Sequence, residues 1–120
     1  METAKTKRYV NVTPHPINIM VEGEDGFPVT VKTIETYSNM YGSVVARVEE
    51  HEVEDGIYKV GSVTDLLPYS DGRDQIVSKP VAIALVLSGD LRDDIVFPDR
   101  LVRGEKGNVI GCESFGRYVC

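Results

Sequence analysis

The segment QIVSKPVAIALVLSGD, residues 75–90, decides the fold class of this chain of 120 residues. Ser78 is a favourable N-cap, and Pro80 suits the first helical turn, where a missing N–H costs nothing. Gly89 suits the left-handed position that follows the end of a helix. The segment therefore predicts one main helix over residues 79–88. A short strand at 75–77 precedes it, and a strand at 95–98 follows after a charged turn.

On either side of this unit, short runs of alternating or β-branched residues predict further strands. These runs are residues 9–12, 17–21, 28–34, 44–48, 57–63, 100–103 and 108–112. Asp55-Gly56 is the strongest hairpin signal between them. We therefore predict a single α+β domain over residues 1–120, with a small, mostly antiparallel sheet of about seven short strands and the helix near the C-terminus. Residues 1–7 are polar, and we expect them to be flexible.

Composition disfavours several classes of partner. The chain has 13 basic and 19 acidic residues, and its net charge of −6 argues against binding to duplex nucleic acid or to an anionic membrane. No apolar run approaches the roughly 20 residues that span a bilayer, and the N-terminus lacks the apolar core of a signal peptide. Two cysteines, Cys112 and Cys120, are too few for a disulfide framework, so we expect a reducing, cytoplasmic setting with Cys112 as a small apolar residue.

Signals for catalysis are weak. The chain has no phosphate-binding loop, no nucleophile elbow and no dinucleotide fingerprint. His15 and His51 lack the spacing of zinc ligands, so we expect no metal, no cofactor and no enzymatic activity. His15 lies between Pro14 and Pro16, which suits either a ligand contact or general base, or a kink at the end of a strand. The kink is the favoured interpretation.

Acidic residues also allow two interpretations each. The run at residues 49–55 favours the solvated face of a hairpin over a cation site, because calcium loops need glycine and aspartate at set positions. Asp94 with Asp93 and Asp99 would suit acid–base chemistry. An ion pair between Asp94 and Arg92 is the favoured alternative.

The start of the predicted helix is the best candidate for a binding site. The free N–H groups there and the helix dipole favour an anion beside Ser78, and Lys79 would lie next to it. Arg92, Arg100 and Arg103 follow within 25 residues and suit phosphate. The competing interpretation is that these cations simply pair with the aspartates between them.

Five phrases occur in order along the chain: NVTPHPINI (11–19), SVVARV (43–48), DDIVFP (93–98), LVR (101–103) and GNVIGC (107–112). Together they resemble small proteins of tailed phages and prophages that begin with N-L-T-P-H and end with V-R followed by G-x-(I/V)-I-G. This group is similar to the first family of Thoeris anti-defence proteins. The resemblance implies an oligomeric sponge in the infected bacterial host cell, which sequesters a cyclised ADP-ribose signal without cleaving it. Some members are thought to hold cyclic oligonucleotides at separate sites.

The resemblance also implies a set of ligand contacts. Arginines are expected at the pyrophosphate, and Arg92 and Arg103 are the matching positions. An aromatic shelf is expected for adenine, and because the helix has Ala82 and Ile83 there, Phe97 or a tyrosine from a neighbouring subunit would supply it. Arg47, Asn108 and His15 complete the candidate set with Ser78, Lys79 and Arg100. The alternatives are a virion or assembly protein with protein contacts only, and a phosphodiesterase that uses His15 and Asp94.

Overall fold

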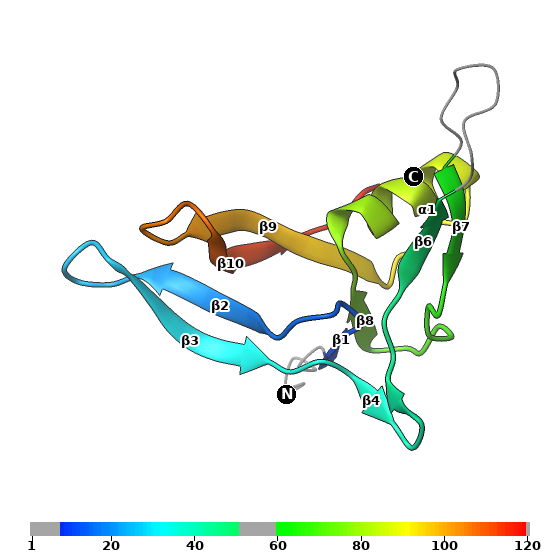
Figure 1. Ribbon diagram of the computed structural model, residues 1–120, viewed down its shortest axis with the longest axis horizontal. Helices are drawn as coiled ribbons and strands as arrows, with labels where there is room; N and C mark the ends of the chain where they lie inside the picture. Colours follow the sequence, from blue (N-terminus) through cyan, green and yellow to red (C-terminus); the bar gives the residue numbers. More distant parts are fainter. Residues whose placement is uncertain (1–7, 51–59, 120) are drawn as a thin grey trace, which may run out of the picture.

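The computed structural model describes residues 8–50 and 60–119, which form one helix and ten strands (Figure 1). In chain order these elements are β1 Arg8–Asn11, β2 Ile17–Glu22, β3 Pro28–Ile34, β4 Ser38–Asn39, β5 Gly42–Ser43, β6 Arg47–Glu50, β7 Val60–Thr64, β8 Arg73–Ile76, α1 Lys79–Ser88, β9 Ile95–Arg103 and β10 Val109–Gly116. Three predictions fall outside the described residues: the turn at residues 55–56, the role of His51 and the expected flexibility of residues 1–7.

Six strands form the main sheet, in the order β1-β8-β9-β10-β2-β3. The pairs β1–β8, β8–β9 and β10–β2 are parallel, whereas β9–β10 and β2–β3 are antiparallel. The prediction of a mostly antiparallel sheet of about seven strands was therefore wrong. The reason lies in the segment that decides the fold: a helix that connects two strands of one sheet is the crossover that parallel pairing requires.

The helix α1 spans the predicted residues, although two long strands follow it, so it lies within the chain rather than near its C-terminus. Ser78 is extended at the N-cap, and Gly89 is left-handed, with φ of 77°, at the end. The amide of Asp90 donates to the Leu85 carbonyl and closes the last turn. One side of α1 buries Val81, Ala82, Ala84 and Leu85 against the core. The described part of the chain is thus mostly β-structure around one helix, whose bounds were correctly predicted.

Strand β9 differs from the prediction of two short strands at 95–98 and 100–103. It runs unbroken through Pro98, and Arg100 takes a positive φ of 48° within it. Its pairing with β8 ends at Val96, so beyond that residue β9 has only β10 as a neighbour. A proline that lacks an amide proton is tolerated there because one edge of the strand needs no donor.

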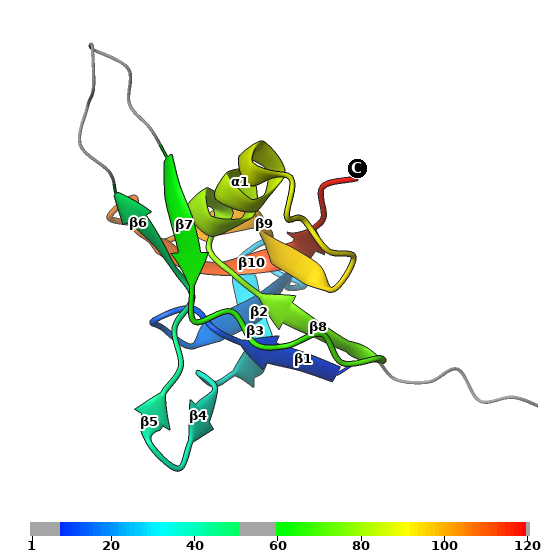
Figure 2. The same ribbon diagram turned by 90° about the vertical axis from the view of Figure 1, so that its right-hand side faces the viewer.

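The region between β3 and β7 also departs from the prediction. Residues 44–46 are outside any strand, and the strand that was expected there begins later, at Arg47. The two short strands β4 and β5 form an antiparallel hairpin in this region, which the sequence patterns did not predict. This hairpin projects from the body of the molecule (Figure 2).

Asn11 links β1 and β3, the two strands at opposite ends of the sheet order. Its side chain, 1% exposed, donates to the carbonyls of His15 at 2.8 Å and Ile34 at 3.1 Å, and accepts from the amide of Thr13 at 2.9 Å. Its carbonyl accepts from the amide of Tyr37 at 2.7 Å. The first phrase of the family resemblance therefore builds a kink between β1 and β2, as favoured for His15. The kink is held by the backbone carbonyl of His15, while its imidazole is exposed.

Candidate functional site

The predicted anion seat at the start of α1 is only partly assembled. The Lys79 ammonium lies 5.9 Å from the centroid of the Phe97 ring, so these two residues meet as expected. Phe97, however, is buried and packs against Tyr118 at a centroid distance of 4.7 Å. The hydroxyl of Ser78 makes no capping hydrogen bond. Phe97 is thus a core residue with the Lys79 ammonium over its ring, in a cation–π contact, rather than an open shelf for a ligand.

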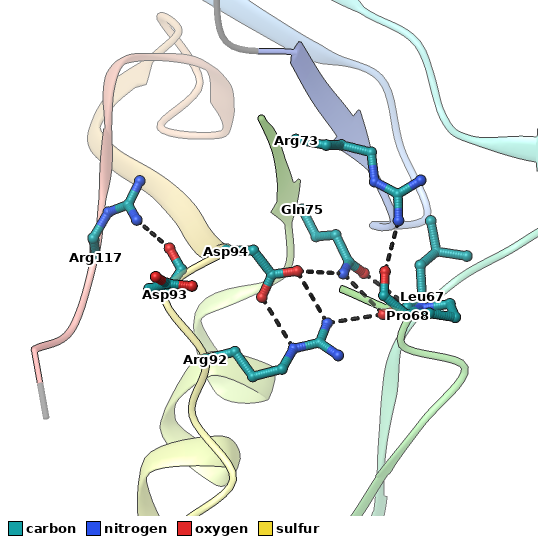
Figure 3. Close-up of polar contacts among 8 residues, drawn as sticks. All are labelled: Leu67, Pro68, Arg73, Gln75, Arg92, Asp93, Asp94 and Arg117. Carbon is teal, nitrogen blue, oxygen red and sulfur yellow. Dashed lines mark hydrogen bonds and ion pairs between the residues drawn. The ribbon is translucent and has the colours of Figure 1, made fainter. Parts of the chain in front are cut away.

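Arg92 belongs to a buried polar network (Figure 3). Its Nε donates to Asp94 Oδ1 at 3.0 Å, and one of its Nη atoms donates to the Leu67 carbonyl at 2.8 Å. The carboxylate of Asp94 is buried, with the residue 2% exposed. Its Oδ2 also accepts from the side-chain amide nitrogen Nε2 of Gln75 at 2.9 Å. The favoured ion pair between Asp94 and Arg92 is confirmed. Both carboxylate oxygens are engaged, so this pair joins the segment between α1 and β9 to β8 and to the loop before β8.

The remaining predicted cations lie elsewhere. Arg103 is at the far end of β9, six residues beyond Phe97, which places it about 20 Å away at roughly 3.3 Å per residue. It donates to the Gly107 carbonyl at 3.0 Å and is exposed. Arg100 and Asn108 are exposed on the same hairpin, and Arg47 is exposed on β6. One chain therefore does not bring Lys79, Arg92 and Arg103 to one place.

A different group of cations and aromatic rings lines a pocket of about 570 Å³. We call it the tyrosine–arginine pocket; its walls come from β1, the end of β3 and the start of β8. It is lined by Arg8, Tyr9, Val10, Lys32, Thr33, Ile34, Glu35, Tyr37 and Arg73. Its volume is typical of small-molecule sites in proteins, which span roughly 300–1,000 Å³.

The charges of this pocket favour an anion. Arg8, Lys32 and Arg73 face one acid, Glu35, among the lining residues. Arg73 donates from one Nη to the Pro68 carbonyl at 2.7 Å. Its Nε is the one buried side-chain nitrogen or oxygen without a hydrogen-bond partner in the described part of the chain. A buried donor left unpaired costs free energy, so a ligand oxygen or a water that reached it would be stabilising.

Two tyrosines frame the same pocket. Tyr9 is half-buried and stacks on Phe115 at a centroid distance of 5.0 Å, while Tyr37 packs at the edge of the core. Sequence reasoning missed this site because its residues are scattered from position 8 to position 73. The parallel register that sets Arg8 beside Arg73 assembles them, and no local pattern signals it.

A smaller pocket of about 190 Å³ is mainly acidic. Arg117, which sequence reasoning also missed, donates to Asp74 Oδ2 at 2.8 Å and to the carbonyl of Asp93. The charge of Asp93, followed by burial and the other nearby aspartates, raises the pKa of Tyr69 above its usual value. Among the described residues, no group of histidine, cysteine and acidic side chains could hold a metal ion.

Cys112 lies on β10 at the floor of an apolar pocket of about 270 Å³ that His15 also lines. It is buried, as expected, and burial raises the pKa of its thiol.

Because thiol reagents attack the thiolate, a Cys120→Ser variant should show almost no labelling at pH 8. The same variant should label fully in guanidinium chloride, as a colourimetric thiol assay would report. Rapid labelling in native buffer would contradict the burial of Cys112. Since the folded-state pKa is raised, the unfolded chain ionises first, and the free energy of unfolding should fall as the pH rises above about 8.5.

Comparison with known protein families, curated protein sequences and solved structures finds no match for this chain. Within residues 8–50 and 60–119, no helix has the length and apolar character needed to cross a bilayer.

Proposed function

We propose that this protein binds an anionic nucleotide and holds it without chemical change. The observation that carries the proposal is the tyrosine–arginine pocket, where three cations and two aromatic rings converge in a volume that suits such a ligand. Phosphate oxygens are matched by arginine's forked donors, and a purine is matched by a tyrosine face. The resemblance to anti-defence sponges suggests the class of ligand: a cyclic ADP-ribose-type signal or a cyclic nucleotide, sequestered in the cytoplasm of an infected bacterial cell.

The lining of the pocket supports retention rather than turnover. Its side chains bind charge and aromatic rings, and Glu35 is the one carboxylate among its described lining residues. The residues of the phosphodiesterase alternative are separated: His15 lines the apolar pocket next to Cys112, while Asp94 is buried in its bonds to Arg92 and Gln75. A cleavage mechanism would have to use other groups.

The decisive experiment incubates the protein with cyclic ADP-ribose isomers, measures the free ligand by equilibrium dialysis, and then heat-denatures the protein. We expect the ligand to leave solution and to return intact after denaturation. Recovery of an altered ligand would show an enzyme. Ligand that never leaves solution would overturn the proposal and favour the assembly protein, whose surfaces make protein contacts only.

Substitutions locate the site. Charge-assisted hydrogen bonds contribute roughly 1.5–3 kcal/mol each, so Arg8→Ala and Lys32→Ala should each weaken binding about tenfold to a hundredfold. Both side chains are exposed, so the melting temperature should hardly change. Lys106→Ala is the matched control, because it removes an exposed cation that does not line this pocket.

Arg103→Ala tests the site that the resemblance implies. If it weakens binding while Arg8→Ala and Lys32→Ala do not, the ligand lies on the β9–β10 hairpin, and the assignment to the tyrosine–arginine pocket is wrong.

A further inference from the structure

Two hairpins extend from the body of the molecule on the side away from α1 (Figure 1). One is the turn between β2 and β3 with its flanking residues, 20–31, which we call the acidic arm. The other is residues 100–110, between β9 and β10, which we call the basic arm. The strands β2 and β10 pair at Cys112 with Ile19, and the Asn18 side chain donates to the Ile110 carbonyl at 3.1 Å. Beyond these contacts the arms part towards their turns (Figure 1).

The acidic arm exposes more apolar surface than a free hairpin should. Six of the seven residues of β3 are exposed, and β3 is the last strand of the sheet. Phe27 is 70% exposed and Val31 59%, and Val21 and Val29 are also exposed on this arm. The basic arm exposes Leu101 and Val109 in the same way. An apolar ribbon at a sheet edge is a surface that another chain commonly covers.

The charges of the two arms are complementary. The acidic arm carries Glu22, Glu24 and Asp25 and no basic residue before Lys32. The basic arm carries Arg100, Arg103 and Lys106 against Glu105 alone. Within the described residues of one chain, the ion pairs are Arg92 with Asp94 and Arg117 with Asp74, so none joins the two arms. The acidic arm thus carries excess negative charge and the basic arm excess positive charge, so that contact between them would be electrostatically favourable.

We infer that the arms pair with those of a second copy of this chain. Because both arms extend in the same direction, a two-fold axis at their ends sets the acidic arm of each protomer against the basic arm of the other. This arrangement is the reciprocal contact that a closed dimer requires. It covers the exposed valines and Phe27 with Leu101 and Val109, while the opposite charges fix the register. The inference is independent of the proposed ligand, since the tyrosine–arginine pocket is built within one chain.

Charge reversal on each arm gives a direct test. The first variant is Glu22→Lys with Glu24→Lys, and the second is Arg100→Glu with Lys106→Glu. These four side chains are exposed, and none makes a side-chain hydrogen bond or ion pair within residues 8–50 and 60–119. Asp25 and Arg103 are left unchanged, because Asp25 accepts from the Phe27 amide and Arg103 donates to the Gly107 carbonyl.

Sedimentation equilibrium should give the parent chain twice its mass of 13.3 kDa at submillimolar concentration. Each variant alone should dissociate on the order of a hundredfold more readily, because like charges then face each other across both contacts. An equimolar mixture of the two variants should dimerise like the parent, since one then has two basic arms and the other two acidic arms. A chain with all four substitutions should also recover the dimer.

Three results would overturn the inference. A parent chain that sediments as a monomer removes the dimer. Variants that remain dimeric place the contact elsewhere, with the exposed Ile83, Val86 and Leu87 of α1 as the next surface to test. A mixture of variants that stays monomeric, although each variant unfolds at the parent temperature, shows that the arms do not recognise each other.

Discussion

Asp94→Ala should lower the free energy of unfolding by about 3–5 kcal/mol, which is a large share of the 5–15 kcal/mol typical of a domain. The carboxylate of Asp94 accepts from Arg92 and from the buried Gln75, and its removal leaves both donors in a low-dielectric interior. Arg92 retains its bond to the Leu67 carbonyl and is partly exposed, so the lower end of that range is expected. Urea unfolding followed by circular dichroism measures the change.

Asp93→Ala is the matched control for this prediction. Asp93 is the neighbouring carboxylate and is exposed, and its contact with Arg117 uses its backbone carbonyl, which alanine retains. Its loss should change stability by no more than about 0.5 kcal/mol. If the two substitutions had equal effects, the network around Asp94 would not be an important source of stability.

Asn11→Ala should cost about 2–4 kcal/mol. The side chain of Asn11 satisfies two buried or half-buried carbonyls, those of His15 and Ile34, and accepts from Thr13. Alanine removes the side-chain partner of the Ile34 carbonyl and of the Thr13 amide, whereas the His15 carbonyl keeps its bond from the Thr13 hydroxyl. Each unsatisfied buried polar group costs about 1–3 kcal/mol. Asn11→Asp should be comparably damaging, because it keeps the acceptor but loses the donor and sets a carboxylate against two carbonyl oxygens.

Asn39→Ala is the control for Asn11, because Asn39 is exposed and accepts one bond, from the Tyr41 amide, in the β4–β5 hairpin. It should cost less than about 1 kcal/mol. Amide hydrogen exchange adds a local readout: the Tyr37 amide, bonded to the Asn11 carbonyl, should lose protection in Asn11→Ala before the amides of α1 do. Uniform loss of protection along the chain would argue against a local role in holding the sheet ends together.

The hydrogen bonds of Asn11 give a physical account of the segment NVTPHPINI (11–19), the first phrase of the family resemblance. Asn11, Thr13 and the carbonyl of His15 build the turn between β1 and β2. The phrase is thus explained by the fold of the chain, and the proposed ligand contacts lie at other residues. The tyrosine–arginine pocket lies at the other end of β1, at Arg8 and Tyr9.

Local sequence was sufficient for those features whose causes are local. The helix bounds followed from Ser78, Pro80 and Gly89, since capping and φ preferences act within a few residues. The strand at 28–34 followed from its alternation of valine and threonine. The pair Arg92–Asp94 followed from its close spacing beside a strand.

Tertiary structure alone decided the parallel pairings of β1 with β8 and of β2 with β10, which no crossover helix announces. It also decided the separation of Arg92 from Arg103 and the assembly of the tyrosine–arginine pocket. Arg8 and Arg73 are 65 positions apart and meet because β1 and β8 run parallel in one register. Register depends on the packing of whole strands against the core, and a shift by one residue would turn every side chain to the other face. The local sequence around Arg8 or around Arg73 therefore contains no pattern that predicts their contact. Local sequence predicted elements such as α1 and β3, whereas the register of the strands assembled the candidate site.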